Sequence, residues 1–252
     1  MAFGDAGAYA RFMGRFSEPL APRFADLAGE PGGRVLDVGC GPGVLTAELV
    51  RRHGAVRVDA IDPTPGFVAA ARDRCPGVDV RQGAAEDLPY DDGSYGASYA
   101  QLVVHFMKDP VRGIAEMARV TRPGGSVAAC VWDHGGGRGP LTPFWAAVDE
   151  LDPQQRADGD RLSVGSREGD LERVFGEAGL VDVEGGELSV TIRLESFDDW
   201  WAPFEEPAGS VGDYLASRTP DQVAELKDLI RSGMPDGPQD VTAWTWTALG
   251  RV

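Results

Sequence analysis

The sequence contains no asparagine in its 252 residues, and its only lysines are Lys108 and Lys227. Without asparagine there is no N-glycosylation sequon. Basic residues number 24 against 40 acidic ones, so the formal net charge is −16. A protein that binds nucleic acid or an anionic membrane through phosphates needs a basic face. We therefore expect no nucleic acid and no membrane among the partners.

Long apolar runs and paired cysteines are also missing. No run approaches the roughly 20 apolar residues that cross a bilayer, and the start of the chain lacks the basic and apolar regions of a secretion signal. The three cysteines form no CxxC pair, which favours reduced thiols over a disulfide framework, and the three histidines show no metal-ligand spacing. These features predict a cytoplasmic protein without a metal site.

What is present is an alternation of strand-like and helix-like segments between residues 34 and 132. We predict helices that begin at residues 44, 65 and 110, the last two each after a capping residue followed by proline. Such alternation is typical of an α/β protein with an open parallel sheet covered by helices on both faces. The five predicted strands span residues 34–38, 56–61, 78–80, 99–104 and 126–132.

The C-terminal half is less regular. Apolar periodicity predicts a helix over 171–178, and alternation predicts a strand over 181–194. Thr219 and Gln222 form a capping box for a further helix, and a terminal strand is expected over 241–252. Three segments fit neither period and are candidates for a lid or substrate cap: 1–30, 134–166 and 195–218.

The first predicted strand runs into a glycine-rich turn, Gly39-Cys-Gly-Pro-Gly43. Glycines let the backbone turn tightly and approach a ligand, and a helix N-terminus follows. In the dinucleotide pattern G-x-G-x-x-G the third glycine would stand at Val44, one residue later than here. Asp62 ends the second strand, where a carboxylate can accept hydrogen bonds from a ribose. That acid alone does not separate a dinucleotide from another adenosine cofactor.

The run Val35–Gly43 resembles motif I of the class I S-adenosylmethionine-dependent methyltransferases. Asp62, Gly83–Tyr90 and Arg122–Gly125 stand where later motifs of that superfamily stand. Within it the chain resembles the bacterial type 11 group, and Tyr9–Phe16 is similar to a subgroup of those proteins. The resemblance covers about residues 9–132. It implies a single methyltransferase domain over residues 1–252, with a Rossmann-like, doubly wound, mostly parallel seven-stranded sheet and a partly helical lid.

The resemblance implies S-adenosyl-L-methionine as the cofactor and S-adenosyl-L-homocysteine as its product. Gly39, Gly41 and Gly43 would pass under the methionyl and ribose portions, while Asp37 would brace this turn or the amino group. The other implied cofactor residues are Asp62 for the ribose hydroxyls, Pro63 against the adenine, the backbone of Ala85 and Glu86 at the adenine edge, the carbonyl of Gln101 for the methionyl amine, and Tyr9 and Arg15 over the methionyl end. Ala84 departs from the family, since many relatives carry an aspartate there.

The segment after the fourth predicted strand indicates which class of acceptor is methylated. Enzymes that methylate exocyclic nitrogens in DNA carry (D/N)PP(Y/F) there, whereas this chain has Gln101–Phe106. We therefore expect a small-molecule acceptor with an O, N, S or C nucleophile and in-line displacement. His105, with an ordinary pKa of about 6.5, is the candidate catalytic base for a protonated acceptor, or else packs beside the cofactor. Candidate substrate-binding residues are Phe12, Trp132, His134, Phe144 and Trp200.

Two other functions stay open. One is a nicotinamide-dependent oxidoreductase on the same fold class; the early third glycine and the absence of a Tyr-x-x-x-Lys pair count against it. The other is a cofactor-binding or cyclisation module that transfers no methyl group, for which Ala84 leaves room. The sequence fixes neither the acceptor, the pathway nor the oligomeric state.

Overall fold

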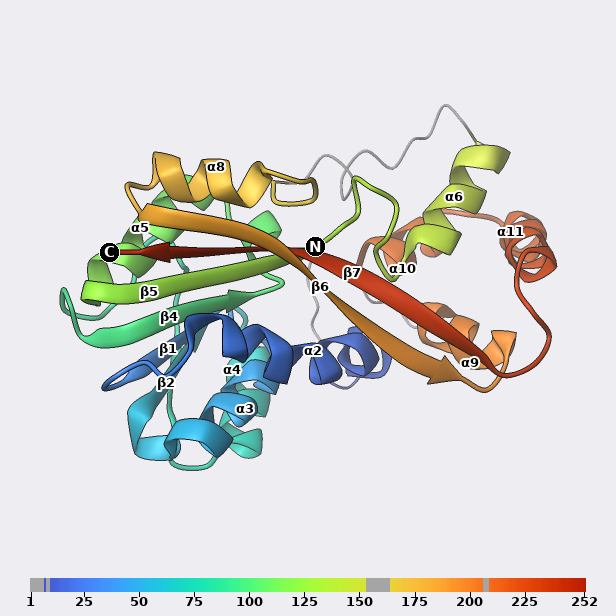
Figure 1. The fold of residues 1–252 in the computed structure, drawn as a ribbon. Helices are drawn as coiled ribbons and strands as arrows, with labels where there is room; N and C mark the ends of the chain where they lie inside the picture. Colours follow the sequence, from blue (N-terminus) through green and yellow to red (C-terminus); the bar gives the residue numbers. More distant parts are fainter. Residues whose placement is uncertain (1–6, 8–9, 153–163, 206–208) are drawn as a thin grey trace.

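The computed structural model describes residues 7, 10–152, 164–205 and 209–252. These residues form a seven-stranded sheet of order β3-β2-β1-β4-β5-β7-β6 (Figure 1). Strands β1 to β5 are parallel, and β7 is antiparallel to both β5 and β6. This arrangement confirms the predicted α/β, doubly wound class. The strands are β1 (Val35–Val38), β2 (Val58–Asp62), β3 (Asp79–Gln82), β4 (Tyr95–Gln101), β5 (Thr121–Trp132), β6 (Val181–Leu194) and β7 (Gln239–Arg251).

Helices cover both faces of the sheet. Successive side chains of a strand point to opposite faces, so Val35 packs with residues of α2, α3 and α4, whereas Leu36 packs with residues of α5 and α8. All residues of β1 and β2 are buried, which is expected of parallel strands between two helical layers. The helices are α2 (Arg15–Ala25), α3 (Val44–His53), α4 (Pro65–Arg74), α5 (Pro110–Val120) and α8 (Asp170–Glu177).

The strands whose boundaries differ most from the prediction are β4 and β5. β4 starts at Tyr95 and stops at Gln101, because Leu102 takes a positive φ of 61° and a short 3-10 turn follows over Val104–Phe106. The apolar run 99–104 therefore spans the end of the strand and the loop after it. The pairing of β4 with β5 jumps from residues 95 and 121 to residues 97 and 126, so the motif Arg122–Gly125 forms a bulge inside β5, which starts five residues earlier than predicted.

The antiparallel pair of β6 and β7 extends further than the pairing of β7 with β5. β5 pairs with β7 only as far as Thr245, whereas β6 and β7 remain paired from Ser189 and Trp244 to Leu194 and Gln239. The paired strands thus project beyond the carboxyl end of β5, and helices gather around their far end (Figure 1). We call this far end, residues 189–194 and 239–244, together with α6 (Thr142–Leu151), α9 (Phe197–Trp201), α10 (Gly209–Ala216) and α11 (Pro220–Ser232), the cap.

An aromatic cluster forms the centre of the cap. The ring of Phe144 lies 5.0 Å from Trp145, 5.6 Å from Phe204, 5.8 Å from Tyr214 and 6.3 Å from Trp201, centroid to centroid. This cluster is continuous with the core on the α2 face of the sheet. Among the residues that the structure describes, no helix is both long and apolar enough to cross a membrane.

Candidate cofactor site

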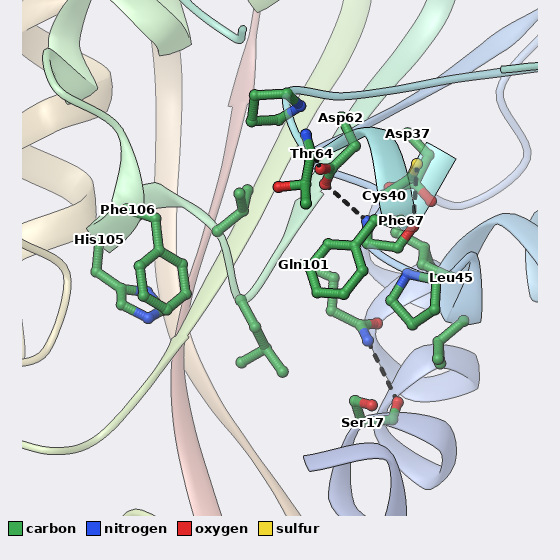
Figure 2. Close-up of a pocket in the computed structure, with 17 residues that line it drawn as sticks. Ser17, Asp37, Cys40, Leu45, Asp62, Thr64, Phe67, Gln101, His105 and Phe106 are labelled. Atoms are coloured by element: carbon green, nitrogen blue, oxygen red, sulfur yellow. Dashed lines mark hydrogen bonds between the residues drawn. The ribbon is translucent and has the colours of Figure 1, made fainter. Parts of the chain in front are cut away.

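A cavity of about 420 Å³ opens at the carboxyl ends of β1, β2 and β4 (Figure 2). This is the edge at which open parallel sheets bind ligands. Its walls come from the turn after β1 and the start of α3, the loop after β2 and the start of α4, the loop after β4, and one residue of α2. The lining residues are Ser17, Asp37, Gly39, Cys40, Gly41, Pro42, Val44, Leu45, Asp62, Pro63, Thr64, Phe67, Gln101, Leu102, Val103, His105 and Phe106.

The turn Gly39–Gly43, which we call the glycine loop, is fixed to the neighbouring strand. The backbone N–H groups of Gly39 and Cys40 both donate to the carbonyl oxygen of Ile61, at 2.8 and 3.0 Å. Gly39 has a φ of 70°, and a Cβ atom there would lie 2.2 Å from Cγ2 of Val103. Only glycine fits this position, so the close approach of the loops after β1 and β4 depends on it.

Asp62 fastens the same loop from β2. Its Oδ2 accepts a hydrogen bond from the backbone N–H of Gly41 at 2.9 Å, and its Oδ1 accepts one from Thr64 at 2.8 Å. Its side chain is buried, and burial raises the pKa of its carboxyl although both backbone donors oppose this. The carboxylate therefore combines a structural task with a position on the cavity wall.

Asp37 is the second carboxyl group of the cavity. It is buried in β1, and the hydroxyl of Thr46 donates a hydrogen bond to its Oδ2 at 2.6 Å. Burial raises the pKa of Asp37 to about 7, against the lowering effect of Thr46 and with a smaller raising effect from Asp62. An incoming cation would favour the charged form of this carboxyl.

Gln101 and Ser17 join β4 to α2 across the cavity. The side-chain Nε2 of Gln101 donates to the backbone carbonyl of Ser17 at 3.2 Å (Figure 2). Gln101 Oε1 and Ser17 Oγ are both buried with no hydrogen-bond partner among the described residues. The family resemblance implied only the backbone carbonyl of Gln101, and it did not indicate Ser17, which directly follows the Tyr9–Phe16 run.

His105 stands in the 3-10 turn after β4. Its ring lies 3.9 Å from that of Phe106 and 6.2 Å from that of His134. Nδ1 is buried and has no partner among the described residues. Burial, with a smaller effect from His134, lowers the pKa of His105 to about 3. The ring is therefore neutral at physiological pH, whereas the ordinary value would place its titration near neutrality.

Some residues expected at the cofactor do not line the cavity. Glu86 is engaged elsewhere: its Oε1 accepts from the backbone N–H of Lys108 at 2.7 Å, and its carbonyl accepts from Arg112 at 2.8 Å. Ala85 is buried and does not line the cavity. Arg15 turns toward the cap and donates to both carboxylate oxygens of Asp199 at 3.0 Å. Tyr9 lies outside the described residues.

Four of the expected substrate-binding residues do not line the cavity either. Trp132 is buried at the end of β5 with its ring 6.2 Å from Phe16, and His134 is buried beside it. Phe144 and Trp200 belong to the core of the cap, and Trp200 lies 4.5 Å from the ring of Phe204. The side chain of Phe12 lies outside the described residues. The aromatic side chains that do face the cavity are Phe67 and Phe106.

Comparison with known proteins agrees with this architecture. Residues 36–129 match the family described as "Methyltransferase domain". The chain is 42% identical over 135 residues to a protein named "Uncharacterized methyltransferase" from Mycobacterium tuberculosis H37Rv, which covers 53% of this chain and 52% of that protein. It is 34% identical over 125 residues to a demethylmenaquinone methyltransferase of Beutenbergia cavernae, covering 50% and 48%. The resemblance to methyltransferases is therefore confirmed, and the chain spans about half the length of these relatives.

The similarity to a solved structure extends into the C-terminal half of the chain. Geranyl diphosphate C-methyltransferase of Streptomyces coelicolor, in complex with Mg²⁺, geranyl diphosphate and S-adenosyl-L-homocysteine, superimposes with a TM-score of 0.53. The alignment covers 93% of this chain and 79% of that one at 17% sequence identity. At this identity the likeness concerns the fold alone, which is that of a Rossmann-like methyltransferase.

Proposed function

Because residues 36–129 match the methyltransferase-domain family, we propose that this chain transfers a methyl group from S-adenosyl-L-methionine to a small-molecule acceptor. The observation that carries the proposal is the glycine loop, which Asp62 holds at the cavity by its bond to Gly41. The demethylmenaquinone named for one relative and the geranyl diphosphate named for the solved structure support a small acceptor rather than a nucleic acid.

The charges around the cavity support this cofactor over a dinucleotide. Asp37 and Asp62 both line the cavity, and two carboxylates would repel a pyrophosphate but attract a cation. The cofactor brings an ammonium and a methyl-bearing sulfonium, which supplies the group to be transferred. Asp62 would hold the ribose hydroxyls, Pro63 and Phe67 would pack against the base, and the glycine loop would lie beneath the remainder.

The residues of the chain itself would align the reacting groups and accept a proton. Displacement at carbon is accelerated mainly when nucleophile, methyl carbon and leaving sulfur are held in line. His105 faces the cavity, is neutral at physiological pH and has an Nδ1 that no described residue engages. We propose that Nδ1 accepts the proton of an acceptor hydroxyl or amine as its bond to carbon forms. Because its low pKa makes the ring a weak base, this role requires an acceptor whose own proton is acidic, such as a phenol.

The cap is our candidate for the part that covers the acceptor. Its helices stand beyond the carboxyl end of β5, on the side to which the cavity opens. A cytoplasmic location is proposed as well, since Cys40, Cys75 and Cys130 are all buried free thiols, as expected in a reducing compartment.

Two measurements test the proposal. Calorimetric titration should give saturable binding of S-adenosyl-L-homocysteine, and the proposal fails if purified protein binds neither this product nor the cofactor. Incubation with methyl-labelled cofactor and a metabolite panel, selected by thermal shift in the presence of the product, should yield labelled acceptor. Binding without transfer to any member would favour the non-methylating module, and saturable binding of reduced nicotinamide cofactor would favour the oxidoreductase.

A further inference from the structure

One side chain of α2 reaches the cavity although α2 belongs to no motif of the sheet. Ser17 is 2% exposed, lines the cavity, and has a hydroxyl without a hydrogen-bond partner among the described residues. A buried hydroxyl left unpaired has lost its bonds to water without replacement, which costs free energy. A ligand that accepts a hydrogen bond from Ser17 would remove this cost.

Gln101 stands opposite Ser17 with the complementary polarity. Its Nε2 is used by the carbonyl of Ser17, which fixes the orientation of the amide and turns Oε1 away from that bond. Oε1 is buried and has no partner among the described residues. The carboxyl of Asp37 lines the same cavity. The cavity thus offers one hydroxyl donor and two oxygen acceptors that its own residues leave available.

We propose that Ser17 and Gln101 together recognise the amino-acid end of the cofactor. The Ser17 hydroxyl donates to its carboxylate, and Gln101 Oε1, with Asp37, accepts from its ammonium. This inference rests on the proposed function for the identity of the ligand. It assigns Ser17, a residue outside every sequence motif of the sheet, as a cofactor-binding residue.

Arg15 has a different part in this arrangement. Its guanidinium is occupied by Asp199 and also donates to the backbone carbonyls of Asp199 and Arg193. These bonds tie the first turn of α2 to β6 and α9. Arg15, two residues before Ser17 on the helix, is therefore engaged with the cap rather than with the ligand carboxylate.

Three ligands distinguish the Ser17–carboxylate contact from the Gln101–ammonium contact. S-adenosyl-L-homocysteine has both ammonium and carboxylate, its decarboxylated analogue S-adenosyl-3-thiopropylamine has the ammonium only, and 5′-methylthioadenosine has neither. Dissociation constants of all three are measured by calorimetry for the wild type and for Ser17→Ala, Ser17→Cys and Gln101→Ala. Ser232→Ala is the matched control, because Ser232 is an exposed helical serine bonded to Leu229.

Ser17→Ala should weaken binding of S-adenosyl-L-homocysteine about tenfold, as expected for a hydrogen bond to a charged group, and leave the other two ligands unchanged. Gln101→Ala should weaken both amine-bearing ligands and spare 5′-methylthioadenosine. Ser17→Cys should fall between wild type and Ser17→Ala, and Ser232→Ala should match the wild type. Because it deletes an unpaired buried hydroxyl, Ser17→Ala should not lower the unfolding temperature.

Equal weakening of all three ligands by Ser17→Ala would mean that Ser17 only shapes the cavity, and would overturn the proposal. Unchanged binding of S-adenosyl-L-homocysteine would overturn it too. If Ser17→Ala unfolds, the same criteria apply to Ser17→Cys. These outcomes differ from failure of the proposed function, in which the wild type itself would not bind S-adenosyl-L-homocysteine.

Discussion

The cavity side of the sheet and the cap are stabilised in different ways. Around the cavity, short contacts of the backbone decide the geometry: the glycine loop bonds to Ile61 and Asp62, and its Gly39 leaves no room for a side chain. In the cap, large rings pack against one another, with Phe144 surrounded by Trp145, Trp201, Phe204 and Tyr214.

Because of this difference, ligand affinity and folding stability depend on different residues. A ligand is recognised by backbone and side-chain polar groups that must stay in place. The Ser17 hydroxyl and Gln101 Oε1 remain unpaired among the described residues and the carboxyl of Asp37 is buried, each at a cost to the fold. The aromatic cluster of the cap buries apolar area without facing the cavity. We therefore expect substitutions in the cap to change stability and those at the cavity to change ligand affinity.

The largest effect on stability is expected from Phe144→Ala. This ring is fully buried, and truncation of such a phenylalanine costs about 3–5 kcal/mol. Urea unfolding would measure the loss, with Val56→Ala as the control, since Val56 is 80% exposed and should change stability by less than about 0.5 kcal/mol. Below the melting temperature, affinity for S-adenosyl-L-homocysteine should stay within about twofold; a large loss of affinity would contradict the separation.

Gly39→Ala, in contrast to Phe144→Ala, should abolish ligand binding. The new Cβ would meet Val103 at 2.2 Å, and overpacking costs about 1–3 kcal/mol, to which the positive φ adds about 1–2 kcal/mol. Because the loops after β1 and β4 must move apart, we expect calorimetry to detect no binding of S-adenosyl-L-homocysteine. Gly41→Ala is the matched comparison: Gly41 also has a positive φ, 54°, but no atom lies within 4 Å of its added Cβ. Equal binding by both variants would contradict this account.

Asp37→Asn should reveal the cost of the buried carboxyl through pH. The pKa of Asp37 is about 7 in the folded chain and 3.8 as its ordinary value, so between these values only the folded state holds the proton. Stability then falls as pH rises from 4 to 7, by at most about 1.4 kcal/mol per pH unit from this group. Denaturation at pH 5 and pH 8 should show a smaller loss in Asp37→Asn than in the wild type, together with weaker binding of S-adenosyl-L-homocysteine. An identical pH dependence would refute the assignment.

The smallest effect concerns the ion pair that joins the two regions. Arg15 and Asp199 are both about one-third exposed, and such pairs contribute about 0.2–1 kcal/mol. A double-mutant cycle with Arg15→Ala and Asp199→Asn should return a coupling energy in that range. Affinity for S-adenosyl-L-homocysteine should change less than about twofold in Arg15→Ala. A tenfold loss would restore Arg15 as the ligand of the methionyl carboxylate.

Local sequence patterns predicted the cavity side well. The helix starts at residues 65 and 110, the glycine loop and the acid that ends β2 are each predicted from a few neighbouring residues, because tight turns and helix starts depend on local backbone preferences. Of the two predicted capping residues, Asp109 accepts from the backbone N–H of Arg112, whereas the side chain of Thr64 forms no cap hydrogen bond. The capping box at Thr219 is likewise present, with both of its hydrogen bonds formed. The end of β4 was misplaced because an apolar run continues past Gln101, and periodicity does not show where Leu102 turns to a positive φ.

The sequence by itself determined the α/β class, the glycine loop and the two carboxylates, since each depends on residues that are close together in the chain. Only the tertiary structure decided which distant groups meet there. Ser17 lies 84 residues from Gln101, and Arg15 lies 184 from Asp199. The same holds for the pKa values of Asp37 and His105, because desolvation depends on every segment packed around a group and not on its neighbours in the chain.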